Sequence, residues 1–287
     1  MHADEADIDV PLVRRLVATQ FPAWADLPVE PVASAGTDNA MFRLGADLAV
    51  RLPRIADAAN AIAVEQEWLP LLAGRLPVAV PTPVGAGRPA DGYPWPWSVC
   101  RWLPGENPVA GGPTPAEDLA AVVTALRGID PADAPRSGRG VPLATRDAPT
   151  RAAIEASHGL VDTAAATTVW EETLRLPEWQ GPPTWAHTDL SPGNVLVADG
   201  RLTAVIDWSC AGVGDPTVDL VVAWNLLPAT ARPTFRAALA VADDTWLRGR
   251  GWALSIALIQ LPYYQHTNPA LAANSRHVIT EVLADAS

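Results

Sequence analysis

The sequence predicts an α+β fold with a small strand-rich N-terminal lobe and a larger helical C-terminal lobe. Apolar residues in strand-like patterns occupy most of the first hundred residues, whereas helical periodicity prevails after residue 113. The length of 287 residues is sufficient for two lobes, and 49% hydrophobic with 18% charged residues is typical of a globular protein. We place the lobes at residues 1–103 and 104–287, with a linker near 103–113.

Strand and helix signals alternate along the N-terminal lobe. Residues 10–20 predict an amphipathic helix, and "AMFRL" with "LAVRL" predicts a hairpin over 40–52. Residues 58–72 predict a helix that Pro70 kinks or ends. A further strand is predicted over 97–103, so this lobe is mostly sheet.

The C-terminal lobe carries a clear helix start. Thr114 as the cap, Pro115 at the first helical position and Glu117 three residues after the cap predict a helix that ends at Gly128. An irregular insertion rich in proline and glycine follows over 129–150. The other helical patterns lie at 149–174, 216–227, 230–241, 243–261 and 270–284.

Composition limits the classes of function. The formal net charge is −12 and the sequence pI is about 4.7, which argues against binding nucleic acid through a basic face. The acidic N-terminus lacks the features of a secretion signal, and no stretch is long and apolar enough to span a bilayer. Cys100 and Cys210 lie far apart, without metal-site spacing. We expect a cytoplasmic protein without nucleic-acid or membrane partners; the sequence leaves the oligomeric state open.

The stretch "HTDLSPGNVLV", followed by "ADGR" and "LTAVID", concentrates polar residues around a predicted hairpin. Asp189 and Asn194 precede its first strand, and Asp207 ends the second. Oxygen ligands of this kind suit Mg2+, which substrate phosphates usually complete. We expect Asn194 and Asp207 to hold the metal, Asp189 to accept a hydroxyl proton, and His187 to orient the loop.

Each residue also has a plainer interpretation. Asp189 could form the turn before Pro192 and Gly193, Asp207 could be a cap, and His187 could be a structural histidine. The meeting of two acids and an amide at one hairpin favours a functional site.

The pattern His-x-Asp-x-x-x-x-Asn followed by Ile-Asp resembles the catalytic loop and metal-binding acid of protein-kinase-like enzymes. Thr188 and Trp208 replace the arginine and phenylalanine of the protein-kinase motifs. "HTDLSPGN", "VIDW" and "GDPTVDL" together resemble the aminoglycoside phosphotransferase family, which has macrolide and choline kinase relatives. The resemblance covers nearly the whole chain. It implies a two-lobed protein-kinase-like fold, ATP or GTP with Mg2+, and a structural role for the pair Asp215 and Asp219, which together anchor the loop and cap the next helix.

The resemblance also implies a nucleotide site in the first lobe. Arg51 stands where the family commonly has lysine, and Glu67, with Glu65 as the second choice, is expected to pair with it. Cys100 is expected behind the base, with the backbone near Arg101 and Leu103 reading its edge. The loop over the phosphates would contain Gly36, Thr37, Asp38 and Asn39, although an ordinary hairpin turn explains that loop equally well.

The acceptor is expected near Asp189. The resemblance suggests a cationic amino sugar, which acidic residues would suit. The candidate residues, each of which could equally be a solvated or packing side chain, are Asp147, Glu155, Tyr263, Tyr264 and His266.

The function predicted from the sequence is transfer of the terminal phosphoryl group of a nucleoside triphosphate to a hydroxyl of a small molecule, such as an aminoglycoside-like antibiotic. The rival hypotheses are a metabolite kinase with a choline-like or sugar acceptor, and a catalytically silent nucleotide-binding protein. The choice of acceptor, of hydroxyl and of ATP or GTP, and the effect of Arg51, are open at this level. Intact Asp189, Asn194 and Asp207 argue against the silent protein.

Overall fold

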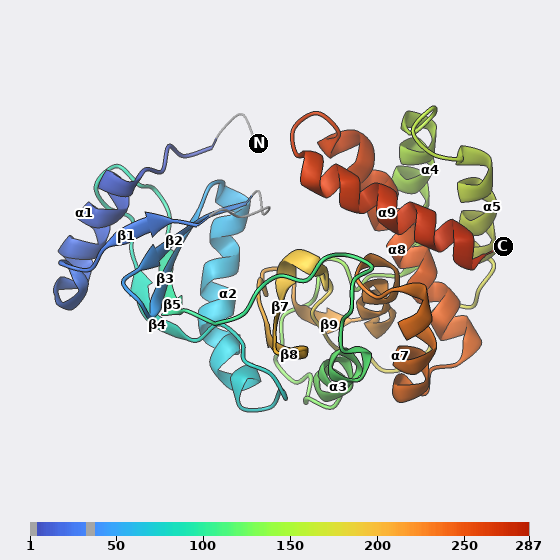
Figure 1. Ribbon diagram of the computed structural model, residues 1–287, viewed down its shortest axis with the longest axis horizontal. Helices are drawn as coiled ribbons and strands as arrows, with labels where there is room; N and C mark the ends of the chain where they lie inside the picture. The colour runs from blue at the N-terminus through green and yellow to red at the C-terminus, as the bar shows by residue number, and fades with distance from the viewer. Residues whose placement is uncertain (1–4, 33–37, 287) are drawn as a thin grey trace. The chain divides into compact units, whose positions relative to one another are not determined.

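The computed structural model describes residues 5–32 and 38–286. The chain divides into two compact units. The first comprises Met1–Gly105 and Ala204–Ser209, and the second comprises Glu106–Thr203 and Cys210–Ser287 (Figure 1). The fold is α+β, with a strand-rich first unit and a mainly helical second unit, as the sequence predicts.

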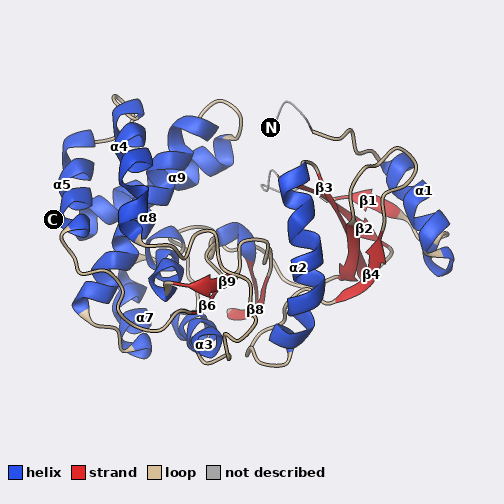
Figure 2. Cartoon of the chain, turned by 180° about the vertical axis from the view of Figure 1, so that it is seen from behind, coloured by secondary structure: helices blue, strands red, loops and turns tan. Residues whose placement is uncertain are grey.

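The first unit is built on a five-stranded antiparallel sheet of order β1-β2-β3-β5-β4. Helices α1 (Val10–Gln20) and α2 (Ala56–Ala73) lie on opposite sides of this sheet (Figure 2). A single turn, η1 (Pro22–Trp24), follows α1. The strands are β1 (Val29–Pro31), β2 (Asn39–Leu44), β3 (Leu48–Pro53), β4 (Pro83–Gly87) and β5 (Trp97–Arg101).

The core of the first unit forms because α1 turns one apolar stripe toward the sheet. Its buried residues recur every three or four positions, which is the period of a helix face. They pack against alternate residues of the strands, including Phe42, Val50 and Trp97. The predicted helix over 10–20 and the hairpin over 40–52 are therefore confirmed.

Pro70 does not end its helix. α2 continues to Ala73 with Pro70 inside it, on an exposed position. Proline removes one backbone hydrogen bond of the helix, and on an exposed face water can satisfy the carbonyl that loses its donor. Of the two alternatives predicted at Pro70, a kink or an end of the helix, the end is wrong for this reason.

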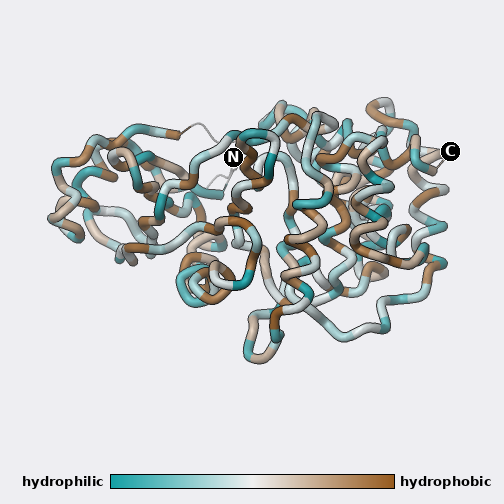
Figure 3. The backbone as a smooth tube through the Cα atoms, turned by 60° about the horizontal axis from the view of Figure 1, so that its bottom comes forward, coloured by the Kyte–Doolittle hydropathy of each residue, from teal (hydrophilic) through white to brown (hydrophobic). Residues whose placement is uncertain are grey.

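The second unit surrounds the long helix α8 (Asp243–Tyr264), which contacts α9 (Pro269–Asp285), α4 (Asp147–Ala156) and α5 (Thr163–Leu174). Apolar residues, brown in Figure 3, are interspersed with polar ones within the helices, as expected when one face is buried. The remaining helices and single turns are α3 (Ala116–Arg127), η2 (Leu143–Arg146), η3 (Pro192–Asn194), η4 (Pro216–Val221), α6 (Val222–Asn225), η5 (Ala229–Ala231) and α7 (Arg232–Leu239).

Two short sheets complete the second unit's elements. One pairs β6 (Thr184–Ala186) with β9 (Gly212–Gly214), and the other is the hairpin of β7 (Val195–Ala198) and β8 (Arg201–Val205). Asp199 and Gly200 both have positive φ, 50° and 73°, which the tight turn of such a hairpin requires. The predicted "ADGR" turn is confirmed.

The start of α3 differs from the prediction. Thr114 does not cap the helix: its hydroxyl donates to the carbonyl of Gly112, and Pro115 occupies the cap position before Ala116. The end of α3 at Gly128 is confirmed. The pattern over 149–174 forms two helices, because the Asp162 carboxylate accepts the backbone N–H groups of Ala164 and Ala165 and so starts α5.

Among the described residues, no helix combines the length and the apolar character needed to cross a bilayer.

Close packing of α8 against α5 yields a stability prediction. A Cβ atom at Gly251 would lie well inside van der Waals contact with the Thr173 side chain. We expect Gly251→Ala to lower the free energy of unfolding by about 1–3 kcal/mol through overpacking, despite the better helix propensity of alanine. Chemical denaturation measures this change.

Gly74→Ala is the matched control, because a Cβ there meets nothing within 4 Å. Equal effects of the two substitutions would contradict the packing of α8 on α5.

Candidate active site

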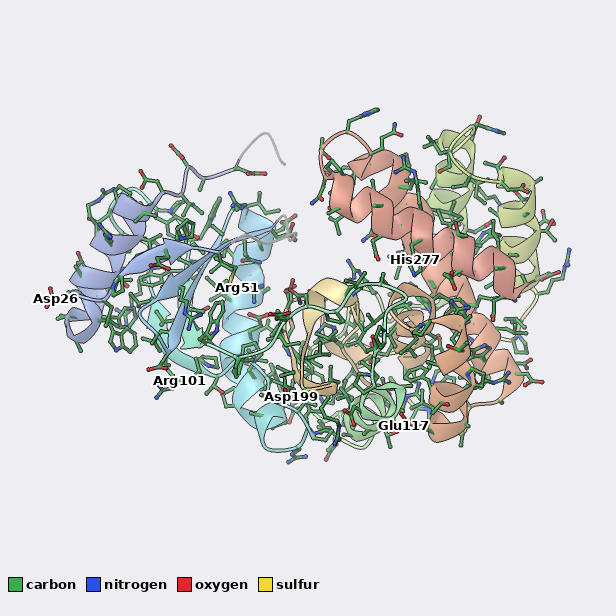
Figure 4. The ribbon with its side chains drawn as sticks, viewed as in Figure 1. Asp26, Arg51, Arg101, Glu117, Asp199 and His277 are labelled. Atoms are coloured by element: carbon green, nitrogen blue, oxygen red, sulfur yellow. The ribbon has the colours of Figure 1, made fainter. Side chains whose placement is uncertain are left out.

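Arg51 lies at the centre of the sheet in the first unit and points toward α2 (Figure 4). Its Nη1 donates to Glu65 Oε2 at 2.5 Å, and its Nη2 donates to Asp207 Oδ1 at 3.3 Å. Burial alone would lower the pKa of Arg51, but the charges of Glu65 and Asp207 raise it above its ordinary value. The guanidinium is therefore a fixed cation on this face of the sheet.

Glu65, not Glu67, is the partner of Arg51. The residues of α2 that face the sheet include Ile62, Glu65 and Leu69, which are three and four positions apart, whereas Glu67 is exposed. Residues two positions apart on a helix point in directions about 200° apart. Only one of the two glutamates can therefore face Arg51. The choice of Glu67 was wrong, and the apolar spacing of Ile62 and Leu69 was the signal that identifies Glu65.

Asp207 follows β8 with a left-handed backbone, φ 58°. Aspartate tolerates this conformation better than most residues. Its Oδ1 also accepts the Ser209 hydroxyl at 2.8 Å, and the buried Trp208 donates to the Val205 carbonyl at 2.9 Å. The segment belongs to the first unit, in which Val205 N donates to Ala79 O.

In the second unit, a short loop between β6 and β7 holds His187, Asp189 and Asn194. Asp219 accepts the backbone N–H groups of His187 and Thr188 at 2.9 and 2.6 Å. Asp215 caps η4 by accepting the N–H of Thr217. The expected anchoring and capping roles of Asp219 and Asp215 are confirmed.

His187 is completely buried beneath the loop. Its Nδ1 lies 3.3 Å from the backbone nitrogen of Asp189 and accepts from it, so Nδ1 carries no proton in this arrangement. This contact gives His187 a means of orienting Asp189 without taking part in proton transfer.

Both carboxylate oxygens of Asp189 are engaged. Oδ1 accepts from Arg139 Nη1, and Oδ2 accepts from the Asn194 side-chain amide at 3.0 Å. The same Asn194 nitrogen donates to the Asp189 carbonyl at 2.8 Å. The side-chain nitrogen of Asn194 is thus turned to Asp189. The side-chain oxygen of Asn194 is therefore the atom that this residue offers to a ligand.

Two residues that the sequence analysis missed support this loop. The Asn107 amide nitrogen contacts the carbonyl oxygens of Pro192, Gly193 and Val195 at 3.2, 3.1 and 2.9 Å. Arg139 lies in the insertion predicted to be irregular, fifty positions from Asp189. No local sequence pattern predicts either contact, because both contacts join segments that are far apart in the sequence.

Of the remaining residues predicted for the nucleotide site, only some lie on the same face of the sheet as Arg51. Gly36 and Thr37 lie outside the described residues. In the antiparallel register Arg51 pairs with Ser98 and Ala49 with Cys100, so Cys100 shares the sheet face of Arg51. Burial raises the pKa of the Cys100 thiol to about 11.

The other residues predicted for the nucleotide site lie at or just beyond the ends of β2 and β5. The Asp38 carbonyl accepts the N–H of Arg54, and Asn39 begins β2 with its Oδ1 buried and lacking a hydrogen-bond partner among the described residues. The Arg101 side chain is exposed, and Leu103 is half-buried.

The five acceptor candidates make contacts of several kinds. Asp147 accepts from Trp170 and Arg151, which fixes α4 to α5. Glu155 and His266 are exposed, and Tyr263 packs edge-on against Tyr264. Within the described ranges, none of the five hydrogen-bonds Asp189.

A cavity of about 250 Å³ in the second unit is a separate feature. Gly140, Trp179 and Arg248 are among its lining residues, whereas Asp189, His187 and Asn194 are not. The chemistry of the loop, and not this cavity, defines the candidate site.

The first unit thus holds a strand arginine paired with a helix glutamate, and the second unit holds the Asp189–Asn194 loop. The profile of the Phosphotransferase enzyme family (APH) matches residues 29–252. The chain therefore belongs to this family.

Two curated relatives share parts of the sequence. An uncharacterized protein of Bacillus subtilis (strain 168), YcbJ, is 27% identical over 195 residues, 60% of this chain and 61% of the relative. An aminoglycoside 3'-phosphotransferase of Escherichia coli is 36% identical over 88 residues, 28% of this chain and 32% of the relative. The chain thus matches less than two thirds of the length of either relative.

Two solved structures share the fold over nearly the whole chain. The GDP and kanamycin complex of APH(2")-IIia has a TM-score of 0.76 at 20% identity, covering 95% of this chain and 98% of that one. The macrolide 2'-phosphotransferase MphH of Brachybacterium faecium, as apoenzyme, has a TM-score of 0.65 at 24% identity, covering 94% and 97%. At these identities the likeness shows the fold.

The assignment of Glu65 can be tested on stability alone. Glu65→Gln keeps the size of the side chain but removes the charge that compensates buried Arg51, so we expect the free energy of unfolding to fall by about 1–3 kcal/mol. Glu67→Gln, on the exposed face of α2, should change it by no more than about 0.5 kcal/mol. Denaturant titration of both variants checks this; the reverse order would restore Glu67 as the partner.

Proposed function

We propose that this protein transfers the terminal phosphoryl group of ATP or GTP to a hydroxyl group of a small molecule. The observation that carries the proposal is the Asp189 carboxylate, held by Asn194 on one oxygen in a loop anchored by Asp219. Relatives of the same fold were solved with GDP or ADP, which supports a nucleotide as the donor.

Arg51 and Glu65 fit a role in binding the nucleotide phosphates. A buried guanidinium whose position is fixed by a carboxylate can bind phosphate oxygens through more than one N–H. This arrangement corresponds to the lysine–glutamate pair of kinases, with arginine in place of lysine. We propose residues 1–103 as the nucleotide-binding lobe, with residues 204–209 joined to it, and 104–287 as the lobe with the catalytic loop and acceptor site.

The donor set of Asn194 and Asp207 suits Mg2+. Asn194 offers an amide oxygen because its nitrogen is bound to Asp189, and Asp207 offers a carboxylate. Mg2+ is usually bound by one or two protein oxygen ligands together with substrate phosphates. We propose these two residues as its ligands; the ion, when bound, would neutralise charge on the phosphates.

Asp189 is the proposed catalytic residue. In the transfer, the acceptor oxygen forms a bond to the terminal phosphorus while the bond to the nucleoside diphosphate oxygen breaks. The proton of the acceptor hydroxyl passes to the Asp189 carboxylate, which orients that hydroxyl beforehand. His187 acts through its contact with the Asp189 backbone and not on the substrate.

An aminoglycoside-like antibiotic is one candidate acceptor, supported by the names of the relatives. A metabolite kinase is the second candidate, favoured by the arginine that lies against Asp189 where acidic residues were expected. Cys100 and Cys210 form no disulfide, which suits the cytoplasm as the proposed location.

The direct test replaces Asp189 by asparagine. Asp189→Asn keeps the size of the side chain but cannot take a proton, so phosphoryl transfer should fall by about 10²- to 10⁴-fold. Affinity for the magnesium nucleotide should stay within about twofold, because Asp189 is not a proposed metal ligand. A nucleotide-consumption assay across aminoglycosides, macrolides and small metabolites, with calorimetric titration of the nucleotide, measures both.

Asp199→Asn is the control, since it makes the same change in the exposed β7–β8 turn, labelled in Figure 4. Equal transfer by Asp189→Asn and the parent would refute the catalytic role. A nucleotide affinity lost with Asp189→Asn would make Asp189 a metal ligand instead.

A further inference from the structure

An arginine lies directly against the proposed catalytic carboxylate. Arg139 Nη1 donates to Asp189 Oδ1 and also contacts the Thr188 carbonyl at 3.3 Å. Both side chains of the Arg139–Asp189 pair are 30% exposed. The contact is therefore accessible to a ligand, and any acceptor whose hydroxyl reaches Asp189 meets the Arg139 guanidinium.

The position of Arg139 is fixed by its own backbone. The hydroxyl of Ser137, which is buried, accepts the N–H groups of Arg139 and Gly140 at 3.1 and 3.2 Å. The same hydroxyl donates to the Cys210 carbonyl at 3.1 Å, and the N–H of Ser137 donates to the Val213 carbonyl. Because four hydrogen bonds hold the backbone of this turn, the Arg139 side chain extends from a fixed backbone position.

A second arginine adds positive charge to the same region. Arg146 donates through Nε to the Ser255 hydroxyl at 2.9 Å, and its guanidinium lies 5.3 Å from the Trp252 ring centre. Burial lowers the pKa of Arg146, and the nearby charge of Arg139 lowers it further. In the described part of the chain, no carboxylate forms an ion pair with Arg146.

Arg139 thus places a guanidinium directly against Asp189, and its charge also acts on Arg146. This cation lies beside the carboxylate although the whole chain carries −12. An ammonium group on the acceptor would be repelled here, whereas a carboxylate or phosphate would receive charge-assisted hydrogen bonds from arginine. Asp147, one of the acids expected to bind a cationic acceptor, is bound to Trp170 and Arg151.

We propose that the acceptor carries an anionic oxygen group, a carboxylate or a phosphate, near its reactive hydroxyl, and that Arg139 and Arg146 bind this group. The proposal rests on the phosphotransferase function proposed above. On binding, the acceptor hydroxyl takes the place of Arg139 Nη1 at Asp189 Oδ1, and Arg139 turns its donors to the anionic group. Arg139 is then a specificity-determining residue, which couples recognition of the acceptor to release of the catalytic carboxylate.

A set of matched compounds tests the proposal. Glycerate, glycerol 3-phosphate, glycerol and 3-amino-1,2-propanediol share a small hydroxylated skeleton and differ in charge. We expect calorimetric titration of the parent protein to show binding of glycerate or glycerol 3-phosphate at least about tenfold tighter than glycerol, with the amine weakest. Comparing the two anions shows whether the site takes carboxylate or phosphate.

The variants assign the preference to the two arginines. Arg139→Gln and Arg146→Gln should each reduce the anion preference by about tenfold. Arg175→Gln removes the same charge from an exposed position at the end of α5 and should leave the preference unchanged.

Thermal unfolding of each variant shows that it is folded. Arg139→Lys gives a second reading, since it keeps the charge and loses the forked geometry, and should retain part of the preference. The proposal is overturned if no anion binds, if the amine binds best, or if the anion preference is the same in Arg139→Gln and Arg175→Gln. Failure of the phosphotransferase proposal is distinct: anion binding would then depend on Arg139 while Asp189→Asn left nucleotide consumption unchanged.

Discussion

The carboxylate of Asp219 accepts two consecutive backbone N–H groups, those of His187 and Thr188, and the loop around Asp189 depends on these bonds. Thr188 has a φ of 67°, a left-handed conformation that is strained for a β-branched residue and costs about 1–3 kcal/mol. Asp219 offsets this cost, as does the bond from the Thr188 hydroxyl to the Cys210 carbonyl at 2.8 Å. The strain falls on the residue immediately before Asp189, where it sets the direction of that side chain.

The remaining contacts of the loop follow from this anchor. With Thr188 fixed, the backbone nitrogen of Asp189 faces His187, and its carboxylate lies between Arg139 and Asn194. Asn107 then holds the carbonyl groups around Asn194. Buried hydrogen bonds of this kind orient a site, because each donor left without a partner would cost about 1–3 kcal/mol.

Local patterns in the sequence were sufficient for much of the fold. The helix over 10–20, the hairpin of β2 and β3 and the turn at Asp199 and Gly200 each depend on neighbours in the chain, and each was predicted. The same holds for the composition of the site loop, since Asp189, Asn194 and Asp207 flank one hairpin. Thr114 shows the limit of local signals, because its hydroxyl bonds to Gly112 instead of capping α3.

Long-range contacts account for what was not predicted. Both Glu65 and Glu67 are compatible with an acidic partner for Arg51, and only the burial of one face of α2 selects Glu65. Arg139 reaches Asp189 from the segment between α3 and η2, far from it in the sequence, so the cation beside the proposed catalytic carboxylate has no signature in the sequence. The expected cationic acceptor followed from the family resemblance, and Asp147, one of the acids named for it, is bound to Trp170 and Arg151.

Amide hydrogen exchange in Asp219→Asn tests the anchoring role of Asp219 most directly. Asparagine presents one oxygen and one NH2 group, which only donates, where two backbone N–H groups bond to separate oxygens, so at least one of the two bonds is lost. We predict faster exchange at His187 and Thr188, with protection in α8 and α9 unchanged. Exchange at these two amides equal to that of the parent would contradict the claim that Asp219 holds the catalytic loop.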